Sequence, residues 1–226
     1  MLFDRKLEAF MAADRILTMV ESAGIDLNNP YDFLNSHWTY DLPYDMQWNN
    51  GASRLVIWDE DYCDYVIKVA LCEKFEKFNQ HEVEVYEAAV KEGLADNFAW
   101  CTCYSQPQYD EFGEYVAPGV YIMEYVDCDE DAVYDSTWKH GYEEYCAMKG
   151  LDASDYSDEQ IRSYDDWNCG EEDDMVLDYI ESSMSDSMRK AFCLFMMKWW
   201  ITDIHYQNVG FVGNRMVMVD YAGWNW

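Results

Sequence analysis

One stretch near the end of the chain decides how the rest is interpreted: Ile201-Thr-Asp203-Ile-His205-Tyr-Gln-Asn208-Val-Gly-Phe-Val-Gly-Asn-Arg-Met-Val-Met-Val-Asp220. Asn208 follows Asp203 by five residues, and Asp220 follows Asn208 by twelve. The two short apolar runs between Asn208 and Asp220 predict a hairpin that brings these two residues to neighbouring ends. Phosphoryl transfer uses one carboxylate near the acceptor and two oxygen ligands for Mg²⁺, so the stretch suits that chemistry.

Size and composition indicate a folded protein. The 226 residues suffice for one large domain or two small lobes, and 50% of them are apolar and 17% aromatic. The formal charge of −30 argues against direct binding to nucleic acid or to an anionic membrane. It favours a basic partner protein, although a merely solubilising acidic surface explains the charge equally well.

The cysteines and the apolar runs of the sequence indicate where in the cell the protein works. The eight cysteines include one close pair, Cys101 and Cys103, without a second pair at zinc spacing. We therefore expect free thiols in a reducing cytoplasm, of the protein's own cell or of an infected host. The charged N-terminal residues do not resemble a signal peptide, and no apolar run reaches the roughly 18 residues of a membrane span.

The first half of the sequence alternates between strand and helix signals. Helical spacing over residues 2–23 ends at Gly24, and an irregular connector follows over residues 26–48. The expected elements after the connector are strands at 53–58 and 65–71, a helix at 79–93, and strands at 98–104 and 119–125. This order predicts a small α+β lobe.

The second half begins with a strongly acidic segment. Residues 127–186 hold 20 acidic against 3 basic side chains, which predicts a solvated, partly mobile insertion with short helices at 138–149 and 172–184. Residues 188–200 are almost wholly apolar, and we expect a buried helix there.

Lys68 is a charged residue inside an apolar strand. A lysine in that position either extends its ammonium group to solvent or points into a cleft. Glu82, on the next helix, shares the inward phase of Val85 and Tyr86 and is the preferred partner for Lys68. Glu84 points elsewhere on that helix and is the second choice. A Lys68–Glu82 pair would direct the ammonium group toward phosphates.

Two further segments complete the candidate set. Gly51 and Ser53 lie in a small-residue turn whose backbone N–H groups would approach phosphates, but a single glycine is a weak signal. The run Val120-Tyr-Ile-Met123-Glu124-Tyr-Val126 reads equally well as an ordinary buried strand.

In this order, these motifs resemble the protein kinase-like superfamily, which includes aminoglycoside and choline kinases and phage kinase-like proteins. The resemblance implies a two-lobed α+β fold that binds ATP and Mg²⁺. The lobes would be a sheet-and-helix N-lobe at 46–124 and a reduced, mostly helical C-lobe at 125–226, with a helix and connector at 1–45 packed on the core.

The resemblance also implies roles for the candidate residues. Backbone groups of Glu124 and Val126 would bind adenine, with Met123 lining the pocket. In the D-x-H-x-x-N motif, Asp203 would orient the acceptor hydroxyl or take its proton, and His205 would lie near the transferring phosphate. Asn208 and Asp220 would hold Mg²⁺.

The sequence also departs from this family. No arginine precedes Asp203, the Asp220-Tyr-Ala-Gly223 segment carries one extra residue, and the chain ends at Trp226. Trp224 and Trp226 would cover part of the core that a longer kinase covers. Two functions therefore stand: a minimal kinase acting on protein Ser or Thr, and a kinase-like acidic effector that occludes a basic surface of a partner. A small-molecule kinase is a third possibility.

Overall fold

The computed structural model describes residues 2–62, 64–168, 170 and 172–221. The chain divides into two compact units, Met1–Ala95 with Ala99–Tyr125 and Asp96–Phe98 with Val126–Trp226. Several residues considered in the sequence analysis lie outside the described part: Cys63, Cys169, Ala222, Gly223, Trp224 and Trp226. No helix within the described ranges has both the length and the apolar character needed to cross a bilayer.

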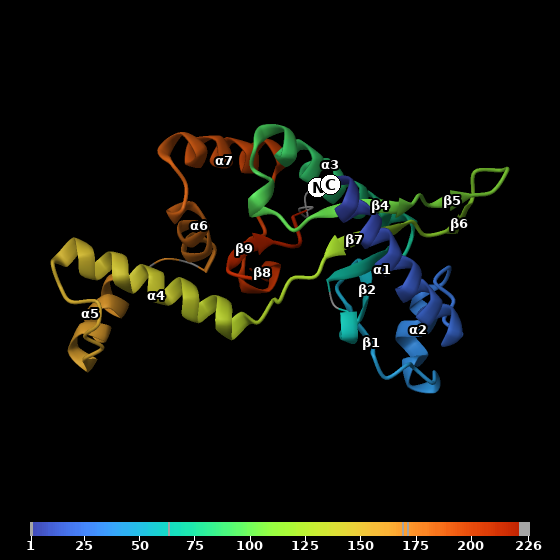
Figure 1. The fold of residues 1–226 in the computed structure, drawn as a ribbon, viewed down its shortest axis with the longest axis horizontal. Helices are drawn as coiled ribbons and strands as arrows, with labels where there is room; N and C mark the ends of the chain where they lie inside the picture. The colour runs from blue at the N-terminus through green and yellow to red at the C-terminus, as the bar shows by residue number, and fades with distance from the viewer. Residues whose placement is uncertain (1, 63, 169, 171, 222–226) are drawn as a thin grey trace. The chain divides into compact units, whose positions relative to one another are not determined.

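The first unit is built on a five-stranded antiparallel sheet with strand order β1-β2-β3-β7-β4 (Figure 1). The strands of this sheet are β1 (Met46–Asn50), β2 (Arg54–Asp59), β3 (Tyr65–Ala70), β4 (Cys101–Ser105) and β7 (Val120–Glu124). Its helices are α1 (Leu2–Ser22), α2 (Pro30–Ser36) and α3 (Glu76–Glu92). The predicted α+β class, with a small antiparallel sheet and a helix in the first lobe, is confirmed.

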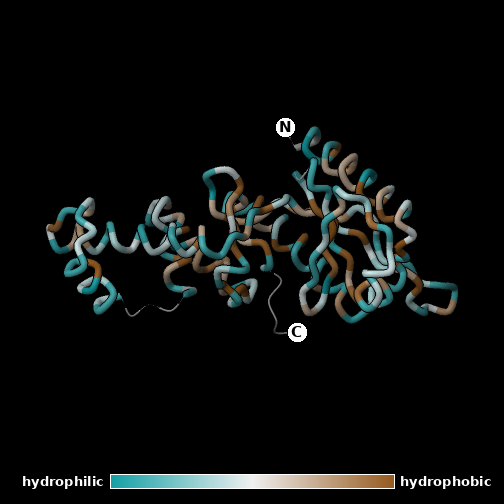
Figure 2. The backbone as a smooth tube through the Cα atoms, turned by 90° about the horizontal axis from the view of Figure 1, so that it is seen from below, coloured by the Kyte–Doolittle hydropathy of each residue, from teal (hydrophilic) through white to brown (hydrophobic). Residues whose placement is uncertain are grey.

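Strand β3 lies in the middle of this sheet and is buried along its whole length. Successive side chains of a strand point to opposite faces, so β3 needs cover on both sides. Helix α1 covers the face that carries Tyr65 and Ile67, and α3 covers the face that carries Lys68. This two-sided burial explains the unbroken apolar composition around Lys68. Figure 2 colours the backbone by hydropathy, with hydrophobic segments in brown.

Helix α3 begins after a 3-10 turn at Glu73–Phe75 and ends at Gly93, whose φ of 75° places it in the left-handed region. The helix ends there because backbone N–H groups at its C-terminus donate to the carbonyls of Ala89 and Val90. The helix therefore starts three residues earlier than the sequence predicts. This extra turn brings Glu76 into the buried part of the first unit.

The second unit contains four helices and one hairpin among its described residues. These elements are α4 (Glu130–Lys149), α5 (Asp158–Trp167), α6 (Glu172–Ser182), α7 (Asp186–Trp199), β8 (Val209–Val212) and β9 (Arg215–Met218). Phe98 is fully buried at its centre, with ring contacts to Phe192, Phe195 and Tyr221. A smaller aromatic core joins α4 to α5 through Tyr142, Tyr145, Cys146 and Tyr164.

Three expectations from the sequence are corrected, and one pair of strands was not expected. Within residues 127–186 the two predicted helices are present, but the first begins at Glu130 rather than at residue 138, and α5 was not predicted; aromatic side chains of α4 and α5 form a core of their own. Helix α7 is not buried all round: Leu194, Met197 and Trp200 are exposed, since only one side of the helix meets the Phe98 core. Strand β1 lies within the predicted irregular connector or turn, so β2 is not the first strand. A second ribbon, β5 (Gln108–Tyr109) with β6 (Tyr115–Ala117), was not predicted.

Candidate active site

Lys68 and Glu82 form a buried ion pair in the first unit. The Nζ atom of Lys68 lies 3.1 Å from Oε2 and 3.3 Å from Oε1 of Glu82. Lys68 is 7% exposed and Glu82 only 2%. Glu84, the second choice in the sequence analysis, is exposed on the same helix. The helical phase of α3 therefore selects Glu82, as the sequence predicted.

Arg54 is a second cation on the same carboxylate, and the sequence analysis did not single it out. Its Nη1 atom lies 2.6 Å from Oε1 of Glu82, and its side chain is buried. Arg54 opens β2 and pairs in register with Ala70, two residues beyond Lys68. The signal was present in the sequence, since an arginine directly before Leu-Val-Ile raises the same question as a lysine inside β3.

The pairing of the strands shows where the other candidate residues of the first unit lie relative to Lys68. Met123 pairs with Val66, two residues from Lys68, so the two side chains lie on the same face of the sheet. Met123 is buried there. Gly51 and Ser53 belong to the turn between β1 and β2, where Gly51 N–H donates to the carbonyl of Arg54 at 3.0 Å. A Cβ atom at Gly51 would meet no heavy atom within 4 Å, so the backbone of this turn is open to close approach.

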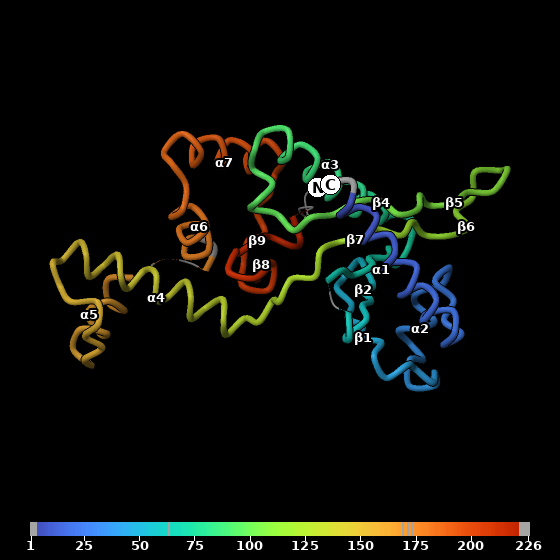
Figure 3. The backbone as a smooth tube through the Cα atoms, in the orientation of Figure 1, coloured from blue at the N-terminus to red at the C-terminus, as the bar shows by residue number. Residues whose placement is uncertain are grey.

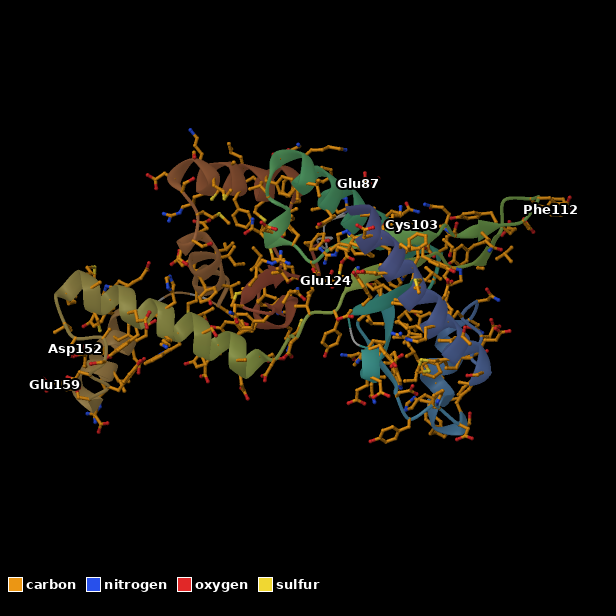
Figure 4. The ribbon with its side chains drawn as sticks, viewed as in Figure 1. Glu87, Cys103, Phe112, Glu124, Asp152 and Glu159 are labelled. Atoms are coloured by element: carbon orange, nitrogen blue, oxygen red, sulfur yellow. The ribbon has the colours of Figure 1, made fainter. Side chains whose placement is uncertain are left out.

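The end of β7 is held by backbone and side-chain contacts. Glu124 N–H donates to the carbonyl of Trp100 at 2.8 Å, and Tyr125 N–H donates to that of Asp64 at 2.9 Å. The Glu124 carboxylate pairs with Arg5 of α1 and also accepts the N–H of Trp100 at 3.1 Å. Figure 4 labels Glu124 where β7 ends. The Glu124 side chain is therefore occupied by its contact with Arg5 of α1, so a ligand would contact Glu124 through the backbone carbonyl group.

The motif from Asp203 to Asn208 folds as a compact turn in the second unit. The Asn208 side-chain amide donates to the carbonyl of Asp203 at 2.9 Å, and Asn208 N–H donates to that of His205 at 2.9 Å. Gln207 N–H donates to Nδ1 of His205 at 3.2 Å, which leaves the Nε2 atom facing Asp203 Oδ1 at 3.7 Å. Asp203 and His205 are both about one-third exposed, so solvent or a ligand can reach them.

The predicted hairpin is present, and it brings Asn208 and Asp220, which are twelve residues apart in sequence, to the same end. Val209 pairs with Met218, and Val219 N–H donates to the carbonyl of Asn208 at 3.0 Å. Asp220 follows directly and is half-buried. Asn208 and Asp220 therefore lie at the same end of the hairpin.

Gly210 fixes this hairpin to the start of the second unit. Asp127 and Phe211 exchange two backbone hydrogen bonds, of 3.2 and 2.9 Å. A Cβ atom at Gly210 would lie 2.2 Å from the carbonyl oxygen of Asp127, closer than any side chain allows. The position accepts only glycine because two backbone segments meet there.

The donor atoms near Asp220 suit a hard cation. Asn208 offers a neutral oxygen and Asp220 a charged one, and oxygen ligands are those that Mg²⁺ prefers. Within the described ranges, no group of three or more His, Cys, Asp and Glu side chains is placed to hold a metal. The six described cysteines are free thiols. A Mg²⁺ ion at this position would thus share its coordination with water and a ligand's phosphates, as Mg²⁺ commonly does.

The candidate residues divide between the two units. Lys68, Glu82 and Arg54 belong to the first, and Asp203, Asn208 and Asp220 belong to the second. The structure fixes the geometry of each half by itself. That the two halves act on one triphosphate remains a prediction.

Comparisons with known proteins give no family assignment. No protein-family model matches the chain, and no curated protein matches it. Among solved structures, the chain resembles APH(2")-IIa in its ternary complex with streptomycin and ATP, with 16% identity, a TM-score of 0.36, and coverage of 85% of this chain and 69% of the other. It also resembles the GDP and kanamycin complex of APH(2")-IIia, with 12% identity, a TM-score of 0.38, and coverage of 87% and 73%. At these TM-scores, neither likeness carries an argument about activity.

Proposed function

We propose that this chain is an ATP-dependent kinase that transfers the γ-phosphate to a hydroxyl group. The observation that carries the proposal is the buried Lys68–Glu82 pair between β3 and α3. Burying two charges costs free energy that their mutual attraction repays only in part, so such a pair is a poor device for stability alone. An ammonium group held in place by a carboxylate suits the α- and β-phosphates of a nucleotide.

The other candidates of the first unit extend this proposal toward ATP. Met123 shares the sheet face of Lys68 and would line the adenine pocket. The carbonyl of Glu124 and the N–H of Val126 would hydrogen-bond the adenine edge, since the Glu124 carboxylate is committed to Arg5. Backbone N–H groups near Gly51 and Ser53 would approach the phosphates.

The second unit would supply the groups for transfer. Asp203 would orient the acceptor hydroxyl and take its proton, and His205 would donate a hydrogen bond to the transferred phosphate. Asn208 and Asp220 would hold Mg²⁺, whose charge offsets that of the phosphates when it is bound. All four side chains lie on one turn and the adjoining hairpin end, which supports their common use.

Protein Ser or Thr in a basic segment is the acceptor we favour. The 20 acidic residues between 127 and 186 would attract basic chains and raise their local concentration. The same feature favours a second candidate function, a kinase-like effector that occludes a basic surface. Many of these carboxylates lie on the folded helices α4, α5 and α6, which pack on one another or on an aromatic core.

The test is nucleotide binding and turnover by the full chain. Mg-ATP at a hundredfold excess over Kd should stabilise the protein by about 2.7 kcal/mol. Lys68→Met and Asp220→Ala should each reduce that thermal shift, while Glu84→Gln, on the exposed side of α3, should leave it unchanged. Asp203→Ala should keep the shift but lose phosphate transfer to a Ser-containing basic peptide.

The outcomes separate the two functions. Absence of any Mg-ATP shift would overturn the kinase proposal and leave the acidic effector. A shift without phosphate transfer to peptide or to the chain itself would indicate nucleotide binding without catalysis. Transfer that survives Asp203→Ala would remove Asp203 from its proposed role.

A further inference from the structure

A separate two-stranded ribbon, β5–β6, connects β4 to β7 where a short turn would be enough. Strands β4 and β7 are antiparallel neighbours, and such strands can be joined by a two-residue hairpin. Here residues 106–119 instead run out through β5 and return through β6 before β7 begins (Figure 3). Phe112 lies at the far end of this ribbon (Figure 4).

The base of the ribbon is fixed to α3 by a buried carboxylate. Oε1 of Glu76 accepts the Tyr115 hydroxyl at 2.7 Å and the N–H of Gly119 at 2.9 Å. Tyr109 and Tyr115 make an edge-to-face contact with ring centroids 5.8 Å apart. The two hydrogen bonds to Oε1 offset part of the burial cost of Glu76, whose Oε2 atom is buried without a hydrogen-bond partner, and they hold the base of the ribbon on α3.

The tip of the ribbon is ordered by a second carboxylate. Oδ1 of Asp110 accepts the backbone N–H groups of Phe112 at 2.8 Å and Glu114 at 2.9 Å. Asp110 N–H donates to the carbonyl of Glu114 at 2.9 Å, and Gly113 N–H donates to that of Asp110 at 3.1 Å. Gly113 adopts a φ of 83°, which a residue with a side chain rarely tolerates. The loop is thus held in one conformation.

This ordered loop displays an exposed aromatic ring. Phe112 is 82% exposed, although the backbone on both sides of it is hydrogen-bonded. A single exposed phenylalanine is common, but one on a projecting loop with this many internal bonds is pre-organised for contact. Large aromatic anchors that enter a partner's pocket often dominate the binding free energy of an interface.

Charge around the ring defines the partner. Asp110, Glu111 and Glu114 surround Phe112 and are all exposed, and no lysine or arginine occurs between residues 92 and 138. Nucleic acid and anionic lipid would be repelled by these carboxylates. A second copy of the chain carries the same charge of −30 and would also be repelled.

We propose that the ribbon 106–119 is a rigid docking arm, whose Phe112 enters an apolar pocket bordered by Lys or Arg side chains on a partner protein. The three carboxylates pair with that basic border. This inference does not depend on the proposed kinase function, because none of these residues belongs to the candidate active site.

The test places the photo-crosslinker p-benzoylphenylalanine at position 112 of the full chain. The matched control carries it at position 44, because Tyr44 is 96% exposed beside Asp45 but lies outside the ribbon. The probe is the fraction of a cell extract that a cation exchanger retains, which enriches basic proteins. The protein captured at position 112 is then purified, and its Kd for each variant is measured by calorimetry.

We expect Phe112→Ala to raise that Kd by roughly tenfold or more, and Tyr44→Ala to leave it unchanged. The double variant Glu111→Gln, Glu114→Gln should raise Kd more at about 50 mM salt than at about 500 mM salt. The proposal is overturned if position 112 captures nothing beyond position 44, if it captures a second copy of the chain, or if Phe112→Ala binds as wild type does.

Discussion

Nη1 of Arg54 lies 2.6 Å from Oε1 of Glu82, inside a buried carboxylate–guanidinium pair. The ammonium group of Lys68 is farther from the same carboxylate, at 3.1 Å. Glu82 therefore retains a close cation whenever Lys68 turns toward another anion. Arg54 and Lys68 also tie β2 and β3 to α3 through one side chain.

Arg54→Met should destabilise the first unit, because it removes the closer cation from a carboxylate that is 2% exposed. The expected loss is about 1–3 kcal/mol, since Lys68 still pairs with Glu82. Arg54→Lys keeps the charge but loses the planar geometry, so its loss should be smaller. Urea midpoints of the two variants and wild type measure this order. Equal midpoints for Arg54→Met and wild type would contradict it.

Glu76→Gln should change how stability depends on pH. Burial raises the pKa of the Glu76 carboxyl, and hydrogen bonds from Tyr115 and Gly119 offset part of that rise. The folded state therefore keeps this proton at higher pH than the unfolded chain does. The stabilisation is fully present below the unfolded pKa of about 4.3 and is lost as pH rises through the folded value.

Glutamine cannot ionise, so Glu76→Gln should gain stability relative to wild type as pH rises through that window. Urea midpoints between pH values of about 4 and 7 would show the gap. Cys103, Tyr115 and Tyr121 lie in the field of Glu76, and the pKa of each is raised, chiefly by burial. These groups ionise above the window. The control is Glu73→Gln, at an exposed position one turn earlier, whose urea midpoint should follow that of wild type at every pH. If Glu73→Gln gained as much stability with rising pH as Glu76→Gln does, the effect could not be assigned to Glu76.

Gly210→Ala should disrupt the second unit, because its Cβ would lie 2.2 Å from the carbonyl oxygen of Asp127. Separating the two backbone segments would weaken the hydrogen bonds between Asp127 and Phe211, at a cost of about 1–3 kcal/mol. Hydrogen exchange at the Phe211 and Asp127 amides reports this directly. Gly51→Ala is the control, since open space surrounds Gly51 and its stability should not change.

Trp200→Gly should stabilise the second unit slightly. Trp200 ends α7 with a φ of 54° and is the one described non-glycine residue with positive φ. Its side chain is 62% exposed, so little packing is lost on removal. Glycine adopts the left-handed conformation without strain, which favours the folded state, but its greater freedom in the unfolded chain offsets part of this. The free energy of unfolding should therefore rise by up to about 1 kcal/mol. Trp200→Ala keeps the strained backbone and should show no gain in thermal midpoint.

The sequence predicted those parts of the fold whose apolar spacing is set by burial. Strand β3 was found because Val66 to Val69 are buried, and helix α3 because Val85, Tyr86 and Ala89 are buried on its expected side. The same spacing gave Glu82 rather than Glu84 as the partner of Lys68. The hairpin after Asn208 was found from its two apolar strands.

The missed parts lack that spacing. Strand β1 reads Met-Gln-Trp-Asn-Asn, with little β-branched or alternating character, and it forms because it completes the sheet edge beside β2. The ribbon strands are too short to show a period. The sequence shows Arg54 as a charged residue beside an apolar run but does not identify its partner, because the register of β2 against β3 brings its side chain to Glu82. The burial of α7 was overestimated because an apolar composition does not show whether neighbours cover one side of a helix or all of it.

The stacked rings of Trp138 and Tyr142, with Tyr164 edge-on to both, form a core separate from the one around Phe98. Segments with separate cores commonly open independently, each with its own free energy. Helix α5 and the C-terminal part of α4 should therefore lose amide protection together, while the N-terminal part of α4 keeps its protection through its contacts with β8 and Tyr206. Part of the strongly acidic segment would thus open and close as a cooperative unit of its own.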